Sequence, residues 1–286
     1  HVPHGSRVRC TVELESGGAW NASLVERWVE PREIDGRLVG EATIEVPSDI
    51  PLGWHTLVAH LEDGSTASAT LIVTPRTLPL HPSIEHGRVW GLMSQIYAAR
   101  SEQSWGMGDL GDLAETAAWA GEDLGADFVL VNPLHAAQPV PPLEASPYLP
   151  ATRRFASPLY LRVEDVPEMA LLTAAEHARV IALTERARRS SVDLIDRDAI
   201  WESKGEALAM LFAVPRSPRR ERGFRRYVRS EGQGLVDFAT WCALVEEHGM
   251  PWRAWAAELR DPRSPAVEEF RREHAEAVEF HMWLQW

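Results

Sequence analysis

The amino-acid sequence predicts a multi-domain β plus α/β protein, with a β-sandwich first, an α/β segment second and a helical region third. Short alternating apolar runs separated by turn formers fill residues 1 to about 75. A strand–helix–strand pattern follows the prolines at 75, 79 and 82, and helical spacing of apolar residues begins near 167. We therefore expect four segments: a sandwich at 1–76, a linker at 77–87, an α/β segment at 88–166 and a helical subdomain at 167–286.

The N-terminal segment has the pattern of a small, immunoglobulin-like β-sandwich. Turn formers such as Gly17-Gly18, Asp35-Gly36 and Asp63-Gly64 separate the alternating runs, and the last of these turns is a strong hairpin signal. Several short strands at this spacing are typical of a sandwich. The strands are expected at 7–14, 22–28, 38–46, 55–61 and 67–73.

The second segment reads as a βαβ unit. Residues 88–97 form a strand candidate, and Leu113, Ala117, Ala120 and Leu124 recur at helical spacing within 109–124. The apolar run at 127–131 is expected of a buried parallel strand. Such a unit is right-handed, but it fits a Rossmann-like sheet as well as the start of a barrel, so the pattern does not choose between them.

The rest of the chain is predicted to be helical. Pro215 to Pro218 and Asp261 to Pro265 interrupt the helical pattern. Four tryptophans on these helices, Trp201, Trp241, Trp252 and Trp255, are expected in the core. The helices are expected at 174–189, 198–212, 221–229, 235–248, 252–259 and 265–286.

Composition narrows the function. The formal net charge is −13, which argues against nucleic acid as the main partner. The arginine-rich stretch 216–229 is read as a solvated helix face. Cys10 and Cys242 are too few and too far apart for a disulfide framework, and neither a secretory signal nor an apolar stretch long enough for a membrane helix is visible. We expect a cytoplasmic protein with two buried thiols and no membrane partner.

The loops after the two α/β strands carry the most specific motifs. The first loop contains Tyr97 and Ser104-Trp105-Gly106-Met107-Gly108-Asp109, and the second contains Asn132-Pro133, Ser146-Pro147-Tyr148 and Arg153-Arg154. The segment 192–204, which ends in Trp201 and Lys204, adds a further match. In order and spacing these motifs resemble the amylomaltase family of 4-α-glucanotransferases, in the α-amylase clan. The leading sandwich resembles the additional N-terminal module of actinobacterial members.

The resemblance implies a (β/α)₈ barrel of which this chain holds the first two strands and a large helical insertion. It also implies a retaining transglycosylase that moves α-1,4-glucan segments from maltodextrin donors to glucose or maltose acceptors without metal or cofactor. The family's catalytic carboxylates would lie past Trp286, so we expect no catalytic residue here and an inactive fragment. The alternative is a glucan-binding module without catalysis.

Six residues are candidates for substrate binding: Tyr148, Ser146, Trp105, Asn132, His135 and Tyr97. They follow the predicted parallel strands, where barrel enzymes place their active sites. Binding is favoured for Tyr148. Packing of Trp105, a turn role for Ser146 and a structural role for His135 remain equally open. Asn132 is chosen because an amide both donates to and accepts from vicinal sugar hydroxyls.

Other signals favour structure over chemistry. Asp109 precedes a predicted helix and is read as its N-cap. Gly106, Gly108 and Gly111 match a dinucleotide-binding pattern, but they do not directly follow a strand, so nucleotide binding ranks last. Arg153 and Arg154 are expected to fix their loop to carboxylates or carbonyls. His274 and His281 lack the spacing of a metal site.

Overall fold

The computed structural model describes residues 2–85, 87–191 and 193–286, and it divides into two compact units, His1–Gly87 and Arg88–Trp286. Val192, the first residue of the 192–204 motif, lies outside the described residues.

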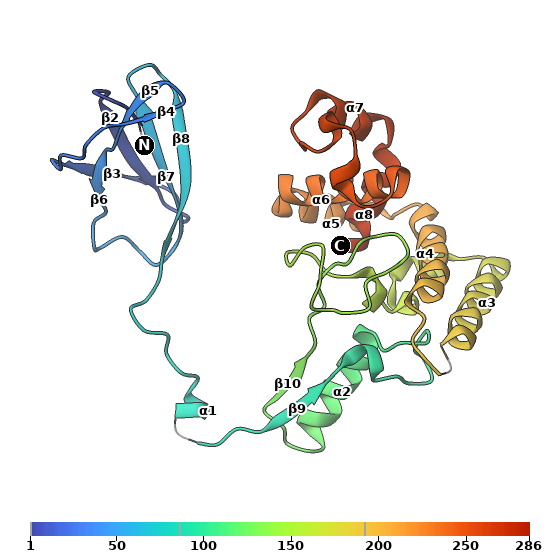
Figure 1. Ribbon diagram of the computed structural model, residues 1–286. Coiled ribbons are helices and arrows are strands. Elements are labelled where there is room, and N and C mark those ends of the chain that lie inside the picture. Colours follow the sequence, from blue (N-terminus) through green and yellow to red (C-terminus); the bar gives the residue numbers. More distant parts are fainter. Residues whose placement is uncertain (1, 86, 192) are drawn as a thin grey trace. The chain divides into compact units, whose positions relative to one another are not determined.

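The first unit consists of antiparallel strands in two sheets (Figure 1). One sheet has the order β6-β3-β2-β7-β8 and the other the order β1-β5-β4. Strand β2 lies centrally, and Val8, Cys10 and Val12 alternate into the core. The strands are β1 (Val2–Pro3), β2 (Val8–Glu13), β3 (Ala19–Val25), β4 (Arg32–Ile34), β5 (Arg37–Gly40), β6 (Thr43–Glu45), β7 (Gly53–Leu61) and β8 (Thr66–Val73).

Two strand predictions in this unit need correction. The expected strand 38–46 is interrupted, because β5 pairs with β1 and β4 in one sheet while β6 pairs with β3 in the other. The strand expected at 22–28 lies three residues earlier as β3, and Trp28 beyond it is 81% exposed. The hairpin between β7 and β8 is confirmed, with Gly64 at its turn at φ +83°.

The second unit begins, after the short helix α1 (Pro82–Glu85), with two parallel strands, β9 (Gly91–Ser94) and β10 (Phe128–Val131). Helix α2 (Leu110–Glu122) connects them and packs against β10 (Figure 1). The strand expected at 88–97 is therefore shorter, and its last part is a 3₁₀ turn, η1 (Ile96–Ala98). The predicted βαβ unit is present with its strands in parallel register.

Helices account for most of the remaining chain, and α3 and α4 lie side by side (Figure 1). The helices are α3 (Ala174–Ser190), α4 (Arg197–Ala213), α5 (Pro218–Glu231), α6 (Gln233–His248), α7 (Pro265–Glu273) and α8 (Ala275–Gln285). The 3₁₀ turns are η2 (Pro158–Tyr160), η3 (Val163–Asp165), η4 (Pro167–Leu171), η5 (Trp252–Ala254) and η6 (Ala257–Leu259).

Two helix predictions were wrong. The expected helix 252–259 is a pair of 3₁₀ turns, since an eight-residue segment is too short to be stable on propensity alone and Trp255 instead turns inward. The expected helix 265–286 is broken at His274, whose ring stacks on Phe270 with centroids 4.0 Å apart.

One apolar cluster runs through the second unit, from Ile96 and Trp105 in the loops to Leu235 on α6 and Trp283 on α8. The loops after β9 and β10 therefore share a core with the helices. Both cysteines are free and buried, as predicted. Among the described residues, no helix combines the length and the apolar character that crossing a membrane requires.

Candidate functional site

The carboxyl ends of β9 and β10 bring the two motif loops together. Asn132, the first residue after β10, is 2% exposed, and its Oδ1 accepts a hydrogen bond of 2.8 Å from the backbone N–H of Ile96. Its Nδ2 donates to the Tyr160 hydroxyl at 3.0 Å. Both polar ends of Asn132 are thus engaged within the protein, and the predicted contact with sugar hydroxyls does not fit this placement.

Trp105 packs beneath the first loop. Its side chain is fully buried, and the indole Nε1 donates to Glu164 Oε1 at 2.9 Å. Neither face is open to a ligand, so of the two readings of Trp105 the structure favours packing over stacking on a sugar. The substrate-binding role of Trp105 stays a prediction.

The glycines of the first loop allow close backbone packing. A Cβ on Gly108 would lie 2.0 Å from the carbonyl oxygen of Ile96 and 2.2 Å from that of Ala99. Gly106 has φ +86°, which favours glycine, and a Cβ there would meet the carbonyl of Ala187. The glycines of this motif thus allow the loop backbone to pack closely against neighbouring carbonyls.

Asp109 caps helix α2, as predicted. Its carboxylate accepts from the backbone N–H groups of Gly111 and Asp112, and the Asp112 carboxylate in turn accepts a hydrogen bond from the backbone N–H of Asp109. This reciprocal arrangement is a capping box with an acidic third residue.

The same carboxylates anchor a buried ionic network. Arg162 is buried, donates from Nε to Asp109 Oδ1 at 2.9 Å and places Nη2 2.8 Å from Asp112 Oδ1. Lys204, the only lysine of the sequence, is fully buried and lies 4.0 Å from Asp109 Oδ2. Its Nζ donates to the carbonyls of Leu159 and Leu161 at 2.7 and 2.8 Å. The network ties α2, α4 and the 159–162 loop into one block.

Burial and neighbouring charges shift the pKa values of these groups in opposite directions. Burial lowers the pKa of Lys204 to about 8, against the opposing attraction of Asp109 and Glu164. Burial alone would raise the pKa of Asp112, but hydrogen bonds from Ser101 and Ser104 and the charge of Arg162 bring it below its ordinary value. Asp109, Asp112 and Glu164 each accept at least one hydrogen bond from a protein donor, which suits a scaffold.

His135, Ser146 and Arg197 line a small cavity of about 30 Å³ beside the second loop. His135 forms an isolated bridge with Ala156, and Ser146 accepts from the backbone N–H of Tyr148 at 3.3 Å, a turn contact. The Arg197 guanidinium lies 5.3 Å from the centroid of the Tyr97 ring. The structure thus groups His135 and Ser146 at one cavity and places Tyr97 in contact with Arg197.

Tyr148 is the candidate most open to solvent, with 61% of its surface exposed. The loop behind it is fixed: Ala151 N–H donates to the Ala136 carbonyl at 2.9 Å. Arg154 donates from Nη2 to the Glu231 carbonyl at 2.9 Å, which confirms the loop-fixing role predicted for it. An exposed ring on a fixed loop can stack on a ligand with little loss of conformational entropy.

Sequence reasoning missed Arg162, Glu164 and Arg197 as partners of the motif residues. Two features of the sequence pointed weakly to this network. Arg162 directly follows the Tyr160-Leu161 pair of the second motif loop, and Lys204 is the only lysine of the sequence. The arginine cluster is also more engaged than a solvated face: Arg220 pairs with buried Glu168 at 2.8 Å. Among the described residues, no three His, Cys, Asp or Glu side chains gather as a metal site would require.

Comparison with solved structures identifies the class of fold. The crystal structure of amylomaltase from Corynebacterium glutamicum is similar to the whole chain, with a TM-score of 0.77 and 40% sequence identity, and the match covers 38% of that protein. A sandwich followed by α/β loops and helices is therefore an amylomaltase-like fold.

Comparison with models of protein families shows to which family the chain belongs. The model described as 4-alpha-glucanotransferase, glycoside hydrolase family 77, matches residues 94–286, and the model described as MalQ N-terminal beta sandwich domain matches residues 1–75. The chain belongs to the 4-alpha-glucanotransferase family. This confirms the resemblance seen in the loop motifs and the β-sandwich expected at the N-terminus.

Relatives named 4-alpha-glucanotransferase extend the match. The chain is 44% identical over 293 residues to the protein of Mycobacterium tuberculosis, covering all of this chain and 40% of that protein. It is 30% identical over 260 residues to the protein of Haemophilus influenzae, covering 83% of this chain and 36% of that protein. The chain thus spans about 40% of the length of the first of these relatives.

Proposed function

We propose that the chain is part of a 4-α-glucanotransferase and supplies loops that contact the glucan. The observation that carries the proposal is the position of Tyr148: exposed, on a fixed loop, and following a parallel strand within a family of glucanotransferases. His135 and Ser146, which line the adjacent cavity, are proposed to contact the same glucan. Tyr97 contributes by holding Arg197 at the cavity edge.

The proposal includes a (β/α)₈ barrel that begins with β9 and β10. Among the described residues these two strands pair only with each other, and Met93 and Leu130 on them are 77% and 56% exposed. Further parallel strands and their helices would cover such residues. The segments 88–166 and 167–286 are then the start of the barrel and a helical insertion.

The chemistry proposed for the whole protein is a retaining double displacement. A carboxylate attacks the anomeric carbon, a second carboxylic acid protonates the departing oxygen and then accepts a proton from the incoming sugar hydroxyl, and the two lie roughly 5–5.5 Å apart. In this proposal both carboxylates lie past Trp286, and this chain alone does not turn over glucan.

Product analysis tests the proposal. The 286-residue chain and a version extended past Trp286 are incubated with maltotriose, and the products are separated by chromatography. We expect glucose and longer dextrins from the extended protein only. Products from the short chain would refute the placement of the carboxylates, and no products from either would favour the glucan-binding module.

A further inference from the structure

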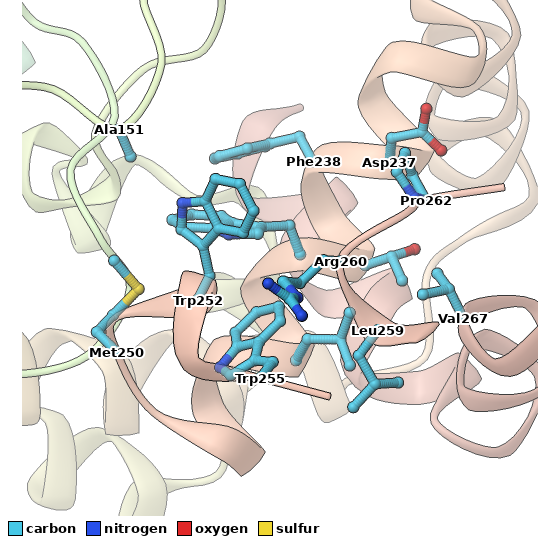
Figure 2. Close-up of a pocket in the computed structure, with 13 residues that line it drawn as sticks. Ala151, Asp237, Phe238, Met250, Trp252, Trp255, Leu259, Arg260, Pro262 and Val267 are labelled. Carbon is cyan, nitrogen blue, oxygen red and sulfur yellow. The ribbon is translucent and has the colours of Figure 1, made fainter. Parts of the chain in front are cut away.

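The helical region contains an open pocket of about 400 Å³ that the proposed function does not use (Figure 2). Its size is in the range of small-molecule sites, roughly 300–1,000 Å³. Helix α6 and the segment of the 3₁₀ turn η5 provide the aromatic walls, and η6 adds Leu259. Figure 2 shows Trp252 and Trp255 below Phe238, with Leu259 beside Trp255. Phe238, Trp241, Trp252 and Trp255 are its aromatic residues.

The aromatic walls are held in place by contacts outside the pocket. Phe238 stacks on Phe155 with centroids 4.6 Å apart, and Trp255 Nε1 donates to the Gly249 carbonyl at 2.8 Å. The guanidinium of Arg253 lies 4.7 Å from the centroid of the Trp252 ring, and Arg253 does not itself line the pocket. Fixed rings lose little entropy when a ligand stacks on them.

Hydrogen-bonding groups are available beside these rings. Within the described ranges of the chain, Trp241 Nε1 and Trp252 Nε1 donate to no protein acceptor, and the Arg260 guanidinium donates to the Arg253 carbonyl at 3.4 Å without a carboxylate partner. Asp237 at the rim already accepts from Gln233 at 2.7 Å. One acidic and one basic side chain line the pocket, so it suits a neutral ligand that has both apolar faces and hydroxyl groups.

The pocket is close to the proposed glucan-contacting loop. Ala151 lines it and stands three residues after Tyr148, a span of at most roughly 11 Å along the chain. A glucan of several glucose units bound at Tyr148 can therefore reach the aromatic walls.

We propose that this pocket binds glucose units of a maltodextrin through stacking on Trp252 and Trp241 and hydrogen bonds from Arg260. The inference rests on the proposed function and deepens it, because a site at this position favours long donors or acceptors over short ones. Pyranose rings offer apolar C–H faces for the indoles and hydroxyl edges for the guanidinium and indole N–H groups.

Calorimetric titration of the 286-residue chain with maltoheptaose tests the inference. Trp252→Ala is expected to weaken binding about tenfold or more, as loss of a central aromatic contact does, and Trp252→Phe to recover most of it. Trp119→Ala is the matched control, since Trp119 is 51% exposed on α2 and lies outside the pocket. Thermal melting of each variant establishes that the fold is retained.

Three results would overturn the inference: no binding of maltoheptaose by the unaltered chain, equal binding by Trp252→Ala, or competition by inorganic phosphate, which would mark an anion site at Arg260. Turnover of maltotriose by the extended protein is measured in parallel. If the extended protein turns over maltotriose but Trp252→Ala binds maltoheptaose as tightly as the unaltered chain, the pocket is refuted and the proposed function stands. If Trp252→Ala weakens maltoheptaose binding but the extended protein shows no turnover, the proposed function is refuted and the pocket stands.

Discussion

At the scale of single residues, Lys204 illustrates how a charged side chain can be structural. It is fully buried and its ammonium donates to two loop carbonyls beside Asp109. Removing one member of such a network leaves the others without partners in the interior, which costs more than the pair contributes when intact. Lys204, Asp109 and Arg162 therefore form one ionic network that fixes the positions of the loops.

The stability contributed by Lys204 should depend on pH. Its pKa is about 8 in the folded chain, below the ordinary value of 10.5, so unfolding takes up a proton between these two pH values. The free energy of unfolding of the unaltered chain, relative to Lys204→Met, should therefore rise as pH increases across this window. Urea denaturation of both proteins at pH 7, 8.5 and 10 measures this difference, and a difference that is flat or falls with pH contradicts it.

Asp109 should matter more than an ordinary helix cap. Asp109→Ala removes the cap of α2 and also leaves Arg162 and Lys204 short of a carboxylate, so we expect a loss of about 3–5 kcal/mol in stability. Asp196→Ala is the matched control, because Asp196 is exposed and caps α4 through a single bond to Ala199. Its loss should be that of an exposed cap, which is smaller. Equal losses in denaturation experiments would rule out the network.

Tyr148 carries the functional prediction at this scale. In the protein extended past Trp286, Tyr148→Ala should raise the KM for maltotriose roughly three- to tenfold with a smaller change in kcat, because stacking binds ground state and transition state alike. Tyr148→Phe should retain most of the affinity. A kinetic profile of Tyr148→Ala that matches the unaltered protein would remove Tyr148 from the site.

The sequence indicated which loops matter but not which side chains are exposed. Tyr148 is open to solvent on its loop, whereas Asn132 and Trp105 are buried and hydrogen-bond to Tyr160 and Glu164, partners 28 and 59 positions away. A local pattern cannot reveal hydrogen-bond partners at that distance. Residues on the loops that follow a strand therefore include buried scaffold residues as well as exposed ones.

At the scale of elements, the predicted helices agree best with the structure where the sequence contains a clear helix-capping residue. Helices α2, α3 and α4 begin close to the predicted positions, and Asp109, Thr173 and Asp196 cap them through side-chain hydrogen bonds. The helix predicted at 252–259 was wrong because the conformation of this segment depends on Trp255. The Trp255 indole donates a hydrogen bond to the Gly249 carbonyl, and the residue is 8% exposed. Tertiary contacts overrode a helix propensity summed over few residues.

Two glycines near and on α2 should respond oppositely to alanine. Gly108→Ala places a methyl group against two backbone carbonyls and should lower the melting temperature of the second unit by several degrees. Gly121→Ala, within α2, meets nothing within 4 Å and should stabilise by about 0.5–1 kcal/mol through the higher helix propensity of alanine. Scanning calorimetry checks both, and a neutral Gly108→Ala would contradict the close packing.

At the scale of the whole molecule, the architecture matches one part of the amylomaltase fold. The second unit holds two parallel strands with apolar residues exposed on them, beside a well-packed helical region. From the βαβ pattern alone, a Rossmann-like sheet and a barrel could not be distinguished, because both begin with the same unit. The loop motifs favoured the amylomaltase family, and the 44% identity to a mycobacterial 4-alpha-glucanotransferase agrees with that family assignment.

Transfer of labelled glucose measures directly whether glucan transfer requires the residues past Trp286. Maltotriose and ¹³C-labelled glucose are supplied to the 286-residue chain and to the protein extended past Trp286, and the position of the label is followed by NMR. We expect the extended protein to place labelled glucose at the reducing end of longer dextrins, and the 286-residue chain to leave it free. Labelled dextrins from the 286-residue chain, or only unlabelled hydrolysis products from the extended protein, would contradict it.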